Sequence, residues 1–339
     1  MIPRLRAFII VFCGFLCMSL LSVIILLLTP RTIITFPYTF FNRTSHPRAF
    51  IIGVDGMGIL PQIVDTPGIH RVIDNGVYTF KAQTVHPSLS AESWASLLHG
   101  VGPEKHNIYT SFSQLENSPE LRKPNTSFPL TSAYPSIFRL MYEKNNSADM
   151  ACFSNWKFIP DYIVEDGIGV FKHYTKSENE LIDKFDEYMK THDPWLVFFQ
   201  LDDVDHAGHM YGFNSQKQEN QLMITDKAVS RIIDIIEKND MYYQDLIVIQ
   251  TDHGGGGPFF EEANIPKPLF ICPSCMHGSR DPIDMTIFWS ARGRGICKSK
   301  EITRDVSIKD TAKFVASFLK LKIPETYDGA DLYSELLCK

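Results

Sequence analysis

Short runs of apolar residues alternate with longer mixed stretches along most of the chain. The short runs are rich in β-branched and aromatic side chains, which is typical of strands buried in a sheet. The longer stretches carry apolar residues three and four positions apart, which is typical of helices that cover one face of a sheet. The predicted strands are residues 49–54, 150–153, 195–201, 246–251 and 286–289, and the clearest predicted helices are residues 178–192 and 221–239.

This alternation predicts an α/β domain with a mainly parallel sheet flanked by helices. In such sheets, ligands bind beyond the carboxyl ends of the strands. Three of the predicted strands run directly into acidic residues. Asp55 follows the first, Asp202, Asp203 and Asp205 follow the third, and Asp252 follows the fourth. We therefore expect a group of carboxylates at one edge of the sheet.

The N-terminal apolar run, residues 7–28, contains no charged residue and is long enough for a helix to cross a bilayer. It lacks the short apolar core and small-residue cleavage site of a signal peptide, so it predicts a single uncleaved transmembrane signal-anchor. Residues 1–6 then form a short cytosolic tail. Residues 29–48, rich in Pro, Thr and aromatics, are predicted to be a stalk, and residues 49–336 a catalytic domain.

The orientation of this predicted span is not fixed by charge, because basic residues lie on both sides of it, at Arg4, Arg6 and Arg31. Asparagine triplets that accept N-linked glycans favour a type II single-pass topology, with the catalytic domain lumenal or extracellular. These triplets begin at Asn42, Asn125 and Asn145.

Composition adds two constraints. The net charge of −6 over 339 residues comes without a basic block, so no nucleic-acid-binding signature is present. Five of the seven cysteines lie beyond the apolar run. The "CPSC" motif at 272–275 is open to a redox or metal-binding role, but a local disulfide or two buried thiols is favoured because no second CxxC completes a zinc knuckle.

The acidic strand ends suggest a metal centre, because several carboxylates at one edge repel one another unless a cation neutralises them. Histidines accompany them in sequence, at His209 and His253. Oxygen and imidazole ligands without thiolates suit Zn²⁺, and Mn²⁺ or Mg²⁺ less specifically.

A hydroxyl-rich segment, "TVHPSLSAESWASLLHGVGPEKHNI" (84–108), leads into a predicted helix. A serine at a helix N-terminus lies where backbone N–H groups favour an anion. The commoner role of such a serine is to cap the helix. The segment alone therefore leaves both a nucleophile and a helix cap open.

Taken in order, these motifs resemble the alkaline phosphatase superfamily, and most closely its type I phosphodiesterase and nucleotide pyrophosphatase branch. The resemblance covers the chain from about Ala49 to near Leu336, and residues 306–336 resemble the closing helix and strand of that family. The matching stretches are "IIGVDGMG" (51–58), "HPSLSAESWASLLHGVGPEKHNI" (86–108), "DHAGHMYG" (205–212), "QTDHGG" (250–255) and "HGSRDPIDMTIFWSARGRGI" (277–296).

The resemblance implies two divalent metal ions, by preference Zn²⁺. The nucleophile is expected at Ser90, whose oxygen is a further ligand, with Ser88 as the alternative. The family usually has threonine as nucleophile and asparagine three residues later, so Ser93 takes the expected substrate-binding position. The first metal would be bound by Asp55, Asp252 and His253, and the second by Asp205, His209 and His277.

The implied function is a metal-dependent phosphohydrolase that cleaves phosphodiester or pyrophosphate bonds through a covalent phosphoserine intermediate. Its substrate would be a small-molecule, nucleotide or lipid phosphoester. A phosphomonoesterase, an ethanolamine-phosphate-type transferase and a non-catalytic binding protein of the same fold remain alternatives. The sulfatase motif C/S-x-P-x-R is absent from residues 86–96.

Six further ionisable residues lie near these motifs. Supporting roles are expected for Asp202, Asp203 and His206, and structural roles for His86, His99 and His106.

Overall fold

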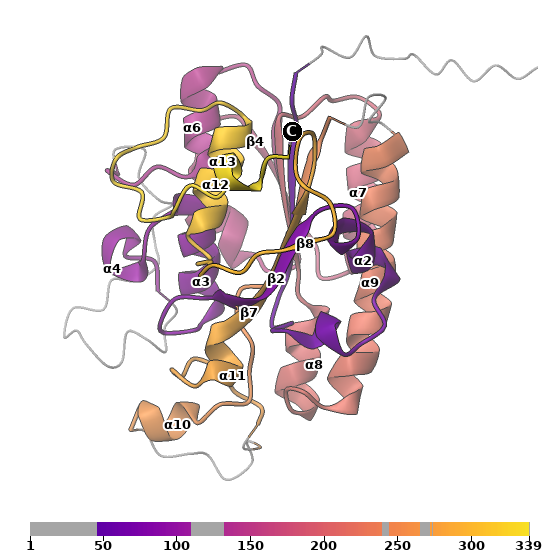
Figure 1. Ribbon diagram of the computed structural model, residues 1–339, viewed down its shortest axis with the longest axis vertical. Coiled ribbons are helices and arrows are strands. Elements are labelled where there is room, and N and C mark those ends of the chain that lie inside the picture. The colour runs from indigo at the N-terminus through magenta and orange to yellow at the C-terminus, as the bar shows by residue number, and fades with distance from the viewer. Residues whose placement is uncertain (1–45, 110–131, 239–243, 265–271, 273, 339) are drawn as a thin grey trace, which may run out of the picture. The chain divides into compact units, whose positions relative to one another are not determined.

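The computed structural model describes residues 46–109, 132–238, 244–264, 272 and 274–338 (Figure 1). These residues belong to one compact unit, Thr44–Lys339. The predicted membrane span, most of the stalk, Asn42 and Asn125 lie outside the described residues. Within the described ranges, no helix combines the length and apolar character needed to cross a bilayer.

The described part of the chain contains one eight-stranded sheet. Neighbouring strands from β4 through β6 are parallel, whereas β7 is antiparallel to both β6 and β2. This confirms the predicted α/β fold with a mainly parallel sheet. In spatial order the strands are β4 (Val170–Tyr174), β3 (Met150–Ser154), β5 (Leu196–Leu201), β1 (Ala49–Val54), β6 (Leu246–Gln250), β7 (Thr286–Arg292), β2 (Val77–Gln83) and β8 (Lys300–Glu301).

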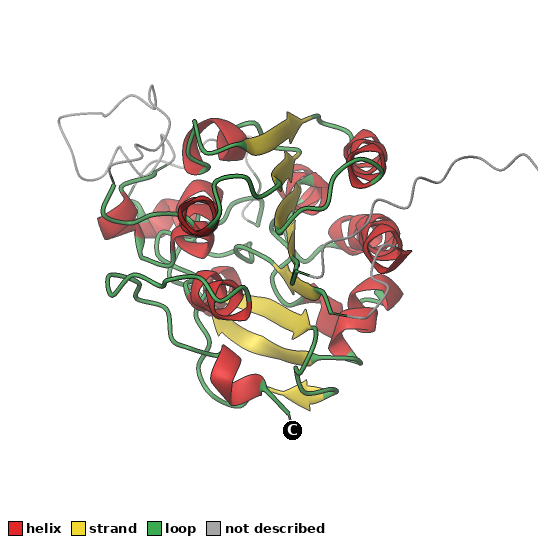
Figure 2. Cartoon of the chain, turned by 90° about the horizontal axis from the view of Figure 1, so that it is seen from above, coloured by secondary structure: helices red, strands yellow, loops and turns green. Residues whose placement is uncertain are grey.

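Helices cover both faces of the sheet (Figures 1 and 2). One face carries α2 (Pro67–Ile73), α7 (Glu178–Met189), α8 (Asp203–Tyr211) and α9 (Gln216–Lys238). The other carries α3 (Ser90–His99), α4 (Pro103–His106), α6 (Ile137–Lys144), α12 (Asp310–Phe318) and α13 (Tyr333–Leu336). The remaining short elements are η1 (Leu60–Gln62), η2 (Ile159–Ile163), α10 (Phe259–Glu262) and α11 (Pro282–Met285).

The hydrophobic core is divided by the sheet into two layers. Along β1, Phe50 and Ile52 pack in the layer below α7 and α9, and Ile51 packs in the layer below α3 and α12. A strand buried on both faces has no polar alternation, because successive side chains enter different apolar layers. This explains why the sequences of the central strands are continuous apolar runs.

The strands that sequence reasoning missed are at the outer parts of the sheet. β2 and β4 carry partly exposed polar and aromatic residues rather than continuous apolar ones, and β8 is two residues long. The tail also differs from the expectation. Its closing helix is α12, but the short helix α13 stands where a strand was expected, and the pairing of this part of the chain is limited to isolated bridges of Ser307 with Gln83 and of Leu337 with Ile296.

The positions of β5, β1 and β6 explain where the acidic residues meet. β1 lies between the other two, with Val54 in register with Leu201 and Gly53 in register with Gln250. The residues that follow these strands therefore emerge side by side at one edge of the sheet. Asp55 lies at the centre of this edge.

Of the two favoured interpretations of the 272–275 motif, the structure has the local disulfide. Cys272 and Cys275 form a local disulfide, Cys297 and Cys338 form a second, and Cys152 is a buried free thiol.

Candidate active site

The first part of the site, called here the nucleophile-side group, consists of Asp55, Ser90, Asp252 and His253. Asp55 and the Asp252–His253 pair follow β1 and β6, and Ser90 is the first residue of α3. The Ser90 hydroxyl lies 3.0 Å from His253 Nε2 and 3.5 Å from Asp55 Oδ1. The structure thus brings these four predicted residues together.

Two residues that sequence reasoning missed hold Asp55 in place. Trp94 Nε1 and Gln200 Nε2 donate hydrogen bonds of 2.9 and 2.8 Å to Asp55 Oδ2. Asp55 Oδ1 is therefore the oxygen that faces Ser90 and His253. The available signal was Gln200 itself, because a fully buried amide inside an apolar strand needs polar partners.

Asp252 is completely buried. Its Oδ1 accepts a 3.0 Å hydrogen bond from the backbone N–H of Gly56. Its Oδ2 lies 3.2 Å from His253 Nε2 and has no hydrogen-bond partner. A buried carboxylate oxygen without a partner is costly unless a cation or proton occupies the space in front of it.

The second part, called here the loop-side group, consists of Asp205, His209 and His277. Asp205 and His209 are four residues apart on α8, so they lie on the same face of the helix, with 3.3 Å between Asp205 Oδ2 and His209 Nε2. His277 comes from the segment before α11, and its Nε2 lies 3.2 Å from that of His209. Asp205 Oδ1 is buried and has no hydrogen-bond partner.

All three histidines are oriented in the same way. Each ring pairs its Nδ1 with a backbone carbonyl, so Nε2 points toward the carboxylates. This arrangement is typical of metal-binding histidines, whose second nitrogen is fixed by an outer hydrogen bond. The carbonyls belong to Gly254 for His253, Cys275 for His209 and Ser88 for His277, at 2.8, 2.7 and 2.9 Å.

The two groups are in direct contact. The rings of His253 and His277 stack with their centroids 3.7 Å apart, and Asp205 Oδ1 lies 4.0 Å from His253 Nε2. Gly56 permits this approach: its φ is +63°, and a Cβ at that position would lie 2.6 Å from Asp205 Oδ1. A side chain here would push the groups apart.

The electrostatics of the nucleophile-side group reflect crowded, buried carboxylates. Burial, reinforced by the charge of Asp205, raises the pKa of Asp55 to about 7. Burial and the charge of Asp55 raise the pKa of Asp252 well above its usual range. Burial lowers the pKa of His253. Burial and mutual repulsion thus disfavour the ionised carboxylates of this group, and a bound cation would offset both effects.

In the loop-side group, neighbouring charges as well as burial determine the pKa values. Burial lowers the pKa of His209, but the hydrogen bond and charge of Asp205 outweigh this effect and raise the pKa to about 9. Burial raises the pKa of Asp205, but its three histidine neighbours hold it below the usual range. His277 has its pKa lowered well below normal by burial and by His253. Asp205 and His209 thus form an ion pair.

The residues present fit divalent cations. Two sets of three buried residues place one candidate ligand atom each within 4.8 Å of one another, and His253 belongs to both. The two partnerless carboxylate oxygens, on Asp205 and Asp252, belong one to each set. The donor set is oxygen and imidazole nitrogen, which suits Zn²⁺. The sets are Asp55, Asp252 and His253, and Asp205, His253 and His277. The second set contains His253 where the predicted ligand set has His209, whose Nε2 lies 3.3 Å from Asp205 Oδ2 and 3.2 Å from His277 Nε2.

The serines of the 86–96 segment have separate environments. Ser90 lies against the nucleophile-side group, whereas the buried Ser88 donates its hydroxyl hydrogen to the carbonyl of Ser279 at 2.8 Å. The geometry therefore favours Ser90 over Ser88 as the candidate nucleophile. The Ser93 hydroxyl is also buried and lies 2.9 Å from that of Thr84. The structure does not bring it into either group, and its role in substrate binding stays a prediction.

The remaining acidic residues lie around the site rather than in it. Asp202 accepts a 2.8 Å hydrogen bond from Gln200, the residue that also holds Asp55. Its pKa is raised to about 7 by burial and by Asp55. His206 is exposed on α8. The structural roles expected of His99 and His106 agree with their buried contacts to backbone carbonyls and to Ser96.

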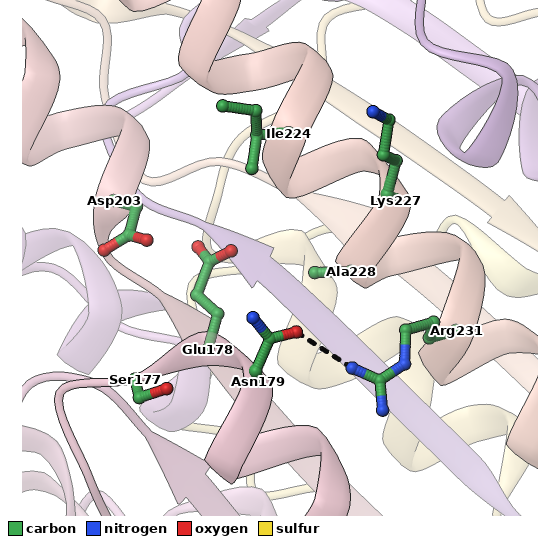
Figure 3. A pocket seen from close by; sticks show the side chains of 8 residues that line it. All are labelled: Ser177, Glu178, Asn179, Asp203, Ile224, Lys227, Ala228 and Arg231. Carbon is green, nitrogen blue, oxygen red and sulfur yellow. Dashed lines mark hydrogen bonds between the residues drawn. The ribbon is translucent and has the colours of Figure 1, made fainter.

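A surface pocket of about 330 Å³ lies between α7, α8 and α9, and it is lined by none of the predicted metal ligands (Figure 3). It contains Glu178 and Asp203, with Arg231 hydrogen-bonded to Asn179. Glu178 accepts from the Thr225 hydroxyl at 3.1 Å. Burial raises the pKa of Glu178 to about 8, and the charge of Asp203 adds to this shift.

A mainly parallel α/β sheet with a serine, three aspartates and three histidines converging at its carboxyl edge defines the class of phosphohydrolases that have an alkaline-phosphatase-like fold. The sequence model of the type I phosphodiesterase/nucleotide pyrophosphatase family matches residues 49–259, which is more than half of the chain. The chain therefore belongs to this family and is a phosphodiesterase/pyrophosphatase-like hydrolase of phosphoric esters. No curated protein matches the chain.

Solved structures share the fold at low sequence identity. An inactive variant of murine ectonucleotide pyrophosphatase/phosphodiesterase 5 in complex with AMP has a TM-score of 0.67 at 15% identity, covering 86% of this chain and 100% of that one. The human protein of the same name has a TM-score of 0.66 at 14% identity, with coverage of 86% and 100%. A 2-O GAG sulfatase has a TM-score of 0.60 at 13% identity, with coverage of 86% and 74%.

Proposed function

We propose that the chain is a metal-dependent phosphohydrolase that cleaves phosphodiester or pyrophosphate bonds through a covalent phosphoserine at Ser90. The observation that carries the proposal is the position of the Ser90 hydroxyl, within 3.0 Å of His253 and 3.5 Å of Asp55. This places a hydroxyl nucleophile at the edge of a buried set of metal ligands, where its low reactivity is best overcome.

Two divalent cations, by preference Zn²⁺, are held by the two groups. Asp55, Asp252 and His253 hold one together with the Ser90 oxygen. Asp205, His209 and His277 hold the other. When bound, such cations lower the pKa of a coordinated hydroxyl or water and neutralise charge on the transferred phosphoryl group.

The residues of the chain then have distinct tasks. The Ser90 oxygen forms a bond to phosphorus as the ester oxygen of the leaving group departs, and water later cleaves the phosphoserine to release phosphate or a monoester. Trp94 and Gln200 keep Asp55 in one orientation throughout. Leu89 caps α3 without a side-chain hydrogen bond, so the first backbone N–H groups of α3 are available to the phosphoryl oxygens.

A nucleotide phosphoester is the substrate class we propose first. The support is the family match, together with the structural neighbour that binds AMP. The test incubates the full-length chain, purified in detergent, with a matched set of aryl monoesters, aryl diesters and dinucleotides, and traps the intermediate by rapid acid quench. Mass spectrometry is expected to find on Ser90 the phosphoryl group with the ester substituent that it keeps, a nucleotidyl group from dinucleotides and an aryl phosphoryl group from aryl diesters.

Other outcomes of this test identify the alternatives. If the protein prefers monoester substrates, its activity is that of a phosphomonoesterase rather than a diesterase. Transfer of the phosphoryl group to an added sugar alcohol in place of water would make the protein a transferase. If no substrate is turned over and Ser90 carries no phosphate, the proposed function is wrong and a binding protein of the same fold remains.

We also propose that residues 7–28 anchor the enzyme in a membrane, with the domain lumenal or extracellular. The support is the uncharged apolar run and the acceptor triplet at Asn145, which lies partly exposed at the end of α6. Expression in a secretory cell is expected to yield a glycan on Asn145 that glycosidase removes. An unglycosylated, protease-accessible domain on the cytosolic side would contradict this topology.

A further inference from the structure

The disulfide-closed turn at Cys272–Cys275 lies directly behind the loop-side group. His209 pairs its Nδ1 with the carbonyl of Cys275 at 2.7 Å. Cys275 itself is buried, and its backbone N–H donates to the carbonyl of Cys272 at 3.3 Å, inside the ring that the disulfide closes. The acceptor that orients His209 is therefore part of a covalently closed turn.

The carbonyls on either side of Cys275 are also engaged. The Ser274 carbonyl accepts from the N–H of Phe213 and the Met276 carbonyl accepts from the N–H of Gly256, each at 2.8 Å. These bonds fasten the turn to the end of α8 and to the glycine-rich loop after β6. Three successive carbonyls thus pair with residues in or next to the elements that carry the predicted metal ligands.

The same segment continues into His277, two residues after Cys275. The ring of Phe213 lies edge-on to both His209 and His277, with centroids 5.4 and 5.6 Å away. A shift of the turn would therefore move His277 directly and release His209 from its acceptor at the same time. In the nucleophile-side group, Asp55 and Asp252 accept hydrogen bonds from Trp94, Gln200 and Gly56, none of which belongs to this segment. Only His253 of that group reaches the segment among the described interactions, through its stack on His277.

We propose that the Cys272–Cys275 disulfide is a positioning element for the loop-side metal. It holds the Cys275 carbonyl where it fixes the Nδ1–H tautomer and ring orientation of His209, and it limits the motion of the backbone that leads to His277. The inference rests on the proposed function, because it assigns the loop-side group to a cation. Outer hydrogen bonds to metal-binding histidines contribute roughly 10–100-fold to metal affinity.

The test compares two double variants of the full-length chain, purified in detergent. Cys272→Ser/Cys275→Ser removes the positioning disulfide, and Cys297→Ser/Cys338→Ser removes a disulfide of the C-terminal tail as the matched control. Zinc affinity is measured by calorimetric competition with a chelator. Asp252→Asn and His209→Ala assign the two dissociation constants to the nucleophile-side and loop-side groups.

The first variant is expected to weaken the loop-side zinc affinity about tenfold or more while the nucleophile-side affinity changes less than about threefold. The control is expected to leave both affinities unchanged. Equal affinities in variant and wild type would overturn the inference. Loss of both affinities would overturn it as well, because the disulfide would then support the whole domain rather than one group.

A second measurement avoids variants that fold poorly. Folded wild-type protein is treated with a water-soluble phosphine, which reduces a disulfide to two thiols and takes up the oxygen of water as phosphine oxide. Mass mapping identifies which disulfide has opened. Loop-side affinity is expected to fall only in samples with Cys272 and Cys275 reduced, and an unchanged affinity in those samples would refute the inference. If wild-type protein binds no zinc at all, the proposed function fails instead.

Discussion

The two ligand groups are built from different parts of the fold. In the nucleophile-side group, Asp55, Asp252 and His253 follow two adjacent central strands and are essentially inaccessible to solvent. In the loop-side group, His209 lies near the end of α8 with 35% of its side chain exposed, and His277 lies in the segment after the disulfide turn. One group is fixed by the sheet, whereas the other depends on a helix end and a loop.

The difference suggests separate roles for the two groups. On the proposed function, Ser90 attacks from the group that the sheet fixes, since even small displacements of a nucleophile are costly to the rate. The loop-side group lies on a helix end and a loop, where His209 is partly exposed.

Removing the nucleophile should have the largest effect. Ser90→Ala is expected to lower turnover by at least about a thousandfold while both groups still bind zinc, because the attacking oxygen is lost but Asp55, Asp252 and His253 remain as ligands. Steady-state diesterase assays and zinc analysis measure the two effects. The control Ser88→Ala changes a hydroxyl that bonds to Ser279. A larger loss in this control than in Ser90→Ala would move the nucleophile to Ser88.

The two groups should differ when one ligand is removed from each. Asp252→Asn is expected to lower kcat about a thousandfold, and His209→Ala about a hundredfold, with one zinc lost in each case. The larger effect follows from the contact of Ser90 with the nucleophile-side group. Zinc content and kcat are measured on the same preparations. Equal losses of kcat in the two variants, or a larger loss in His209→Ala, would contradict the proposed difference between the groups.

The residues that hold Asp55 should have an intermediate effect. Trp94→Phe keeps the buried ring but removes the N–H that Asp55 accepts, and it is expected to weaken nucleophile-side zinc affinity roughly tenfold. Trp289→Phe is the matched control, because Trp289 is equally buried and donates to Thr311 instead. Similar affinities for both variants would show that the hydrogen bond to Asp55 has no positioning role.

The smallest effect on activity is expected at Glu178, which belongs to neither group. Its folded pKa of about 8 is above its ordinary value of 4.5, so the folded state binds the proton more tightly than the unfolded state. Its contribution to stability is therefore greatest below pH 4.5 and is lost as pH rises through 8.

Glu178→Gln tests this expectation. Above pH 8, the free energy of unfolding of the variant should exceed that of wild type by on the order of 2 kcal/mol. Near pH 4 the two free energies should be equal, and kcat should be unchanged. Denaturant unfolding across this pH range measures the gain. A constant stability difference at all pH values would contradict it.

The nucleophile-side group was the easier one to predict from sequence. A continuous apolar strand followed by an acidic residue is a local signal, and parallel pairing brings three such strand ends together. Asp55 and Asp252 therefore follow from the pattern alone. Ser90 and the histidines needed the resemblance to a family, because nothing local distinguishes a nucleophilic serine from a helix cap.

The supporting contacts were not predictable in the same way. Trp94 and Gln200 reach Asp55 across 39 and 145 residues of sequence, so their pairing appears only in the fold. The acceptor for His209 is a backbone carbonyl, which leaves no side-chain signal. β2 and β4 were missed because their partly exposed positions interrupt the apolar runs that identify central strands.

The central claim is that turnover requires a cation in each group, and a zinc titration tests it directly. The full-length chain in detergent is stripped with a chelator, zinc is returned in small steps, and hydrolysis of an aryl phosphodiester is followed at each step. We expect the stripped protein to be inactive and activity to return in full only as the second equivalent of zinc binds. Full activity in the stripped protein, or after a single equivalent, would contradict it.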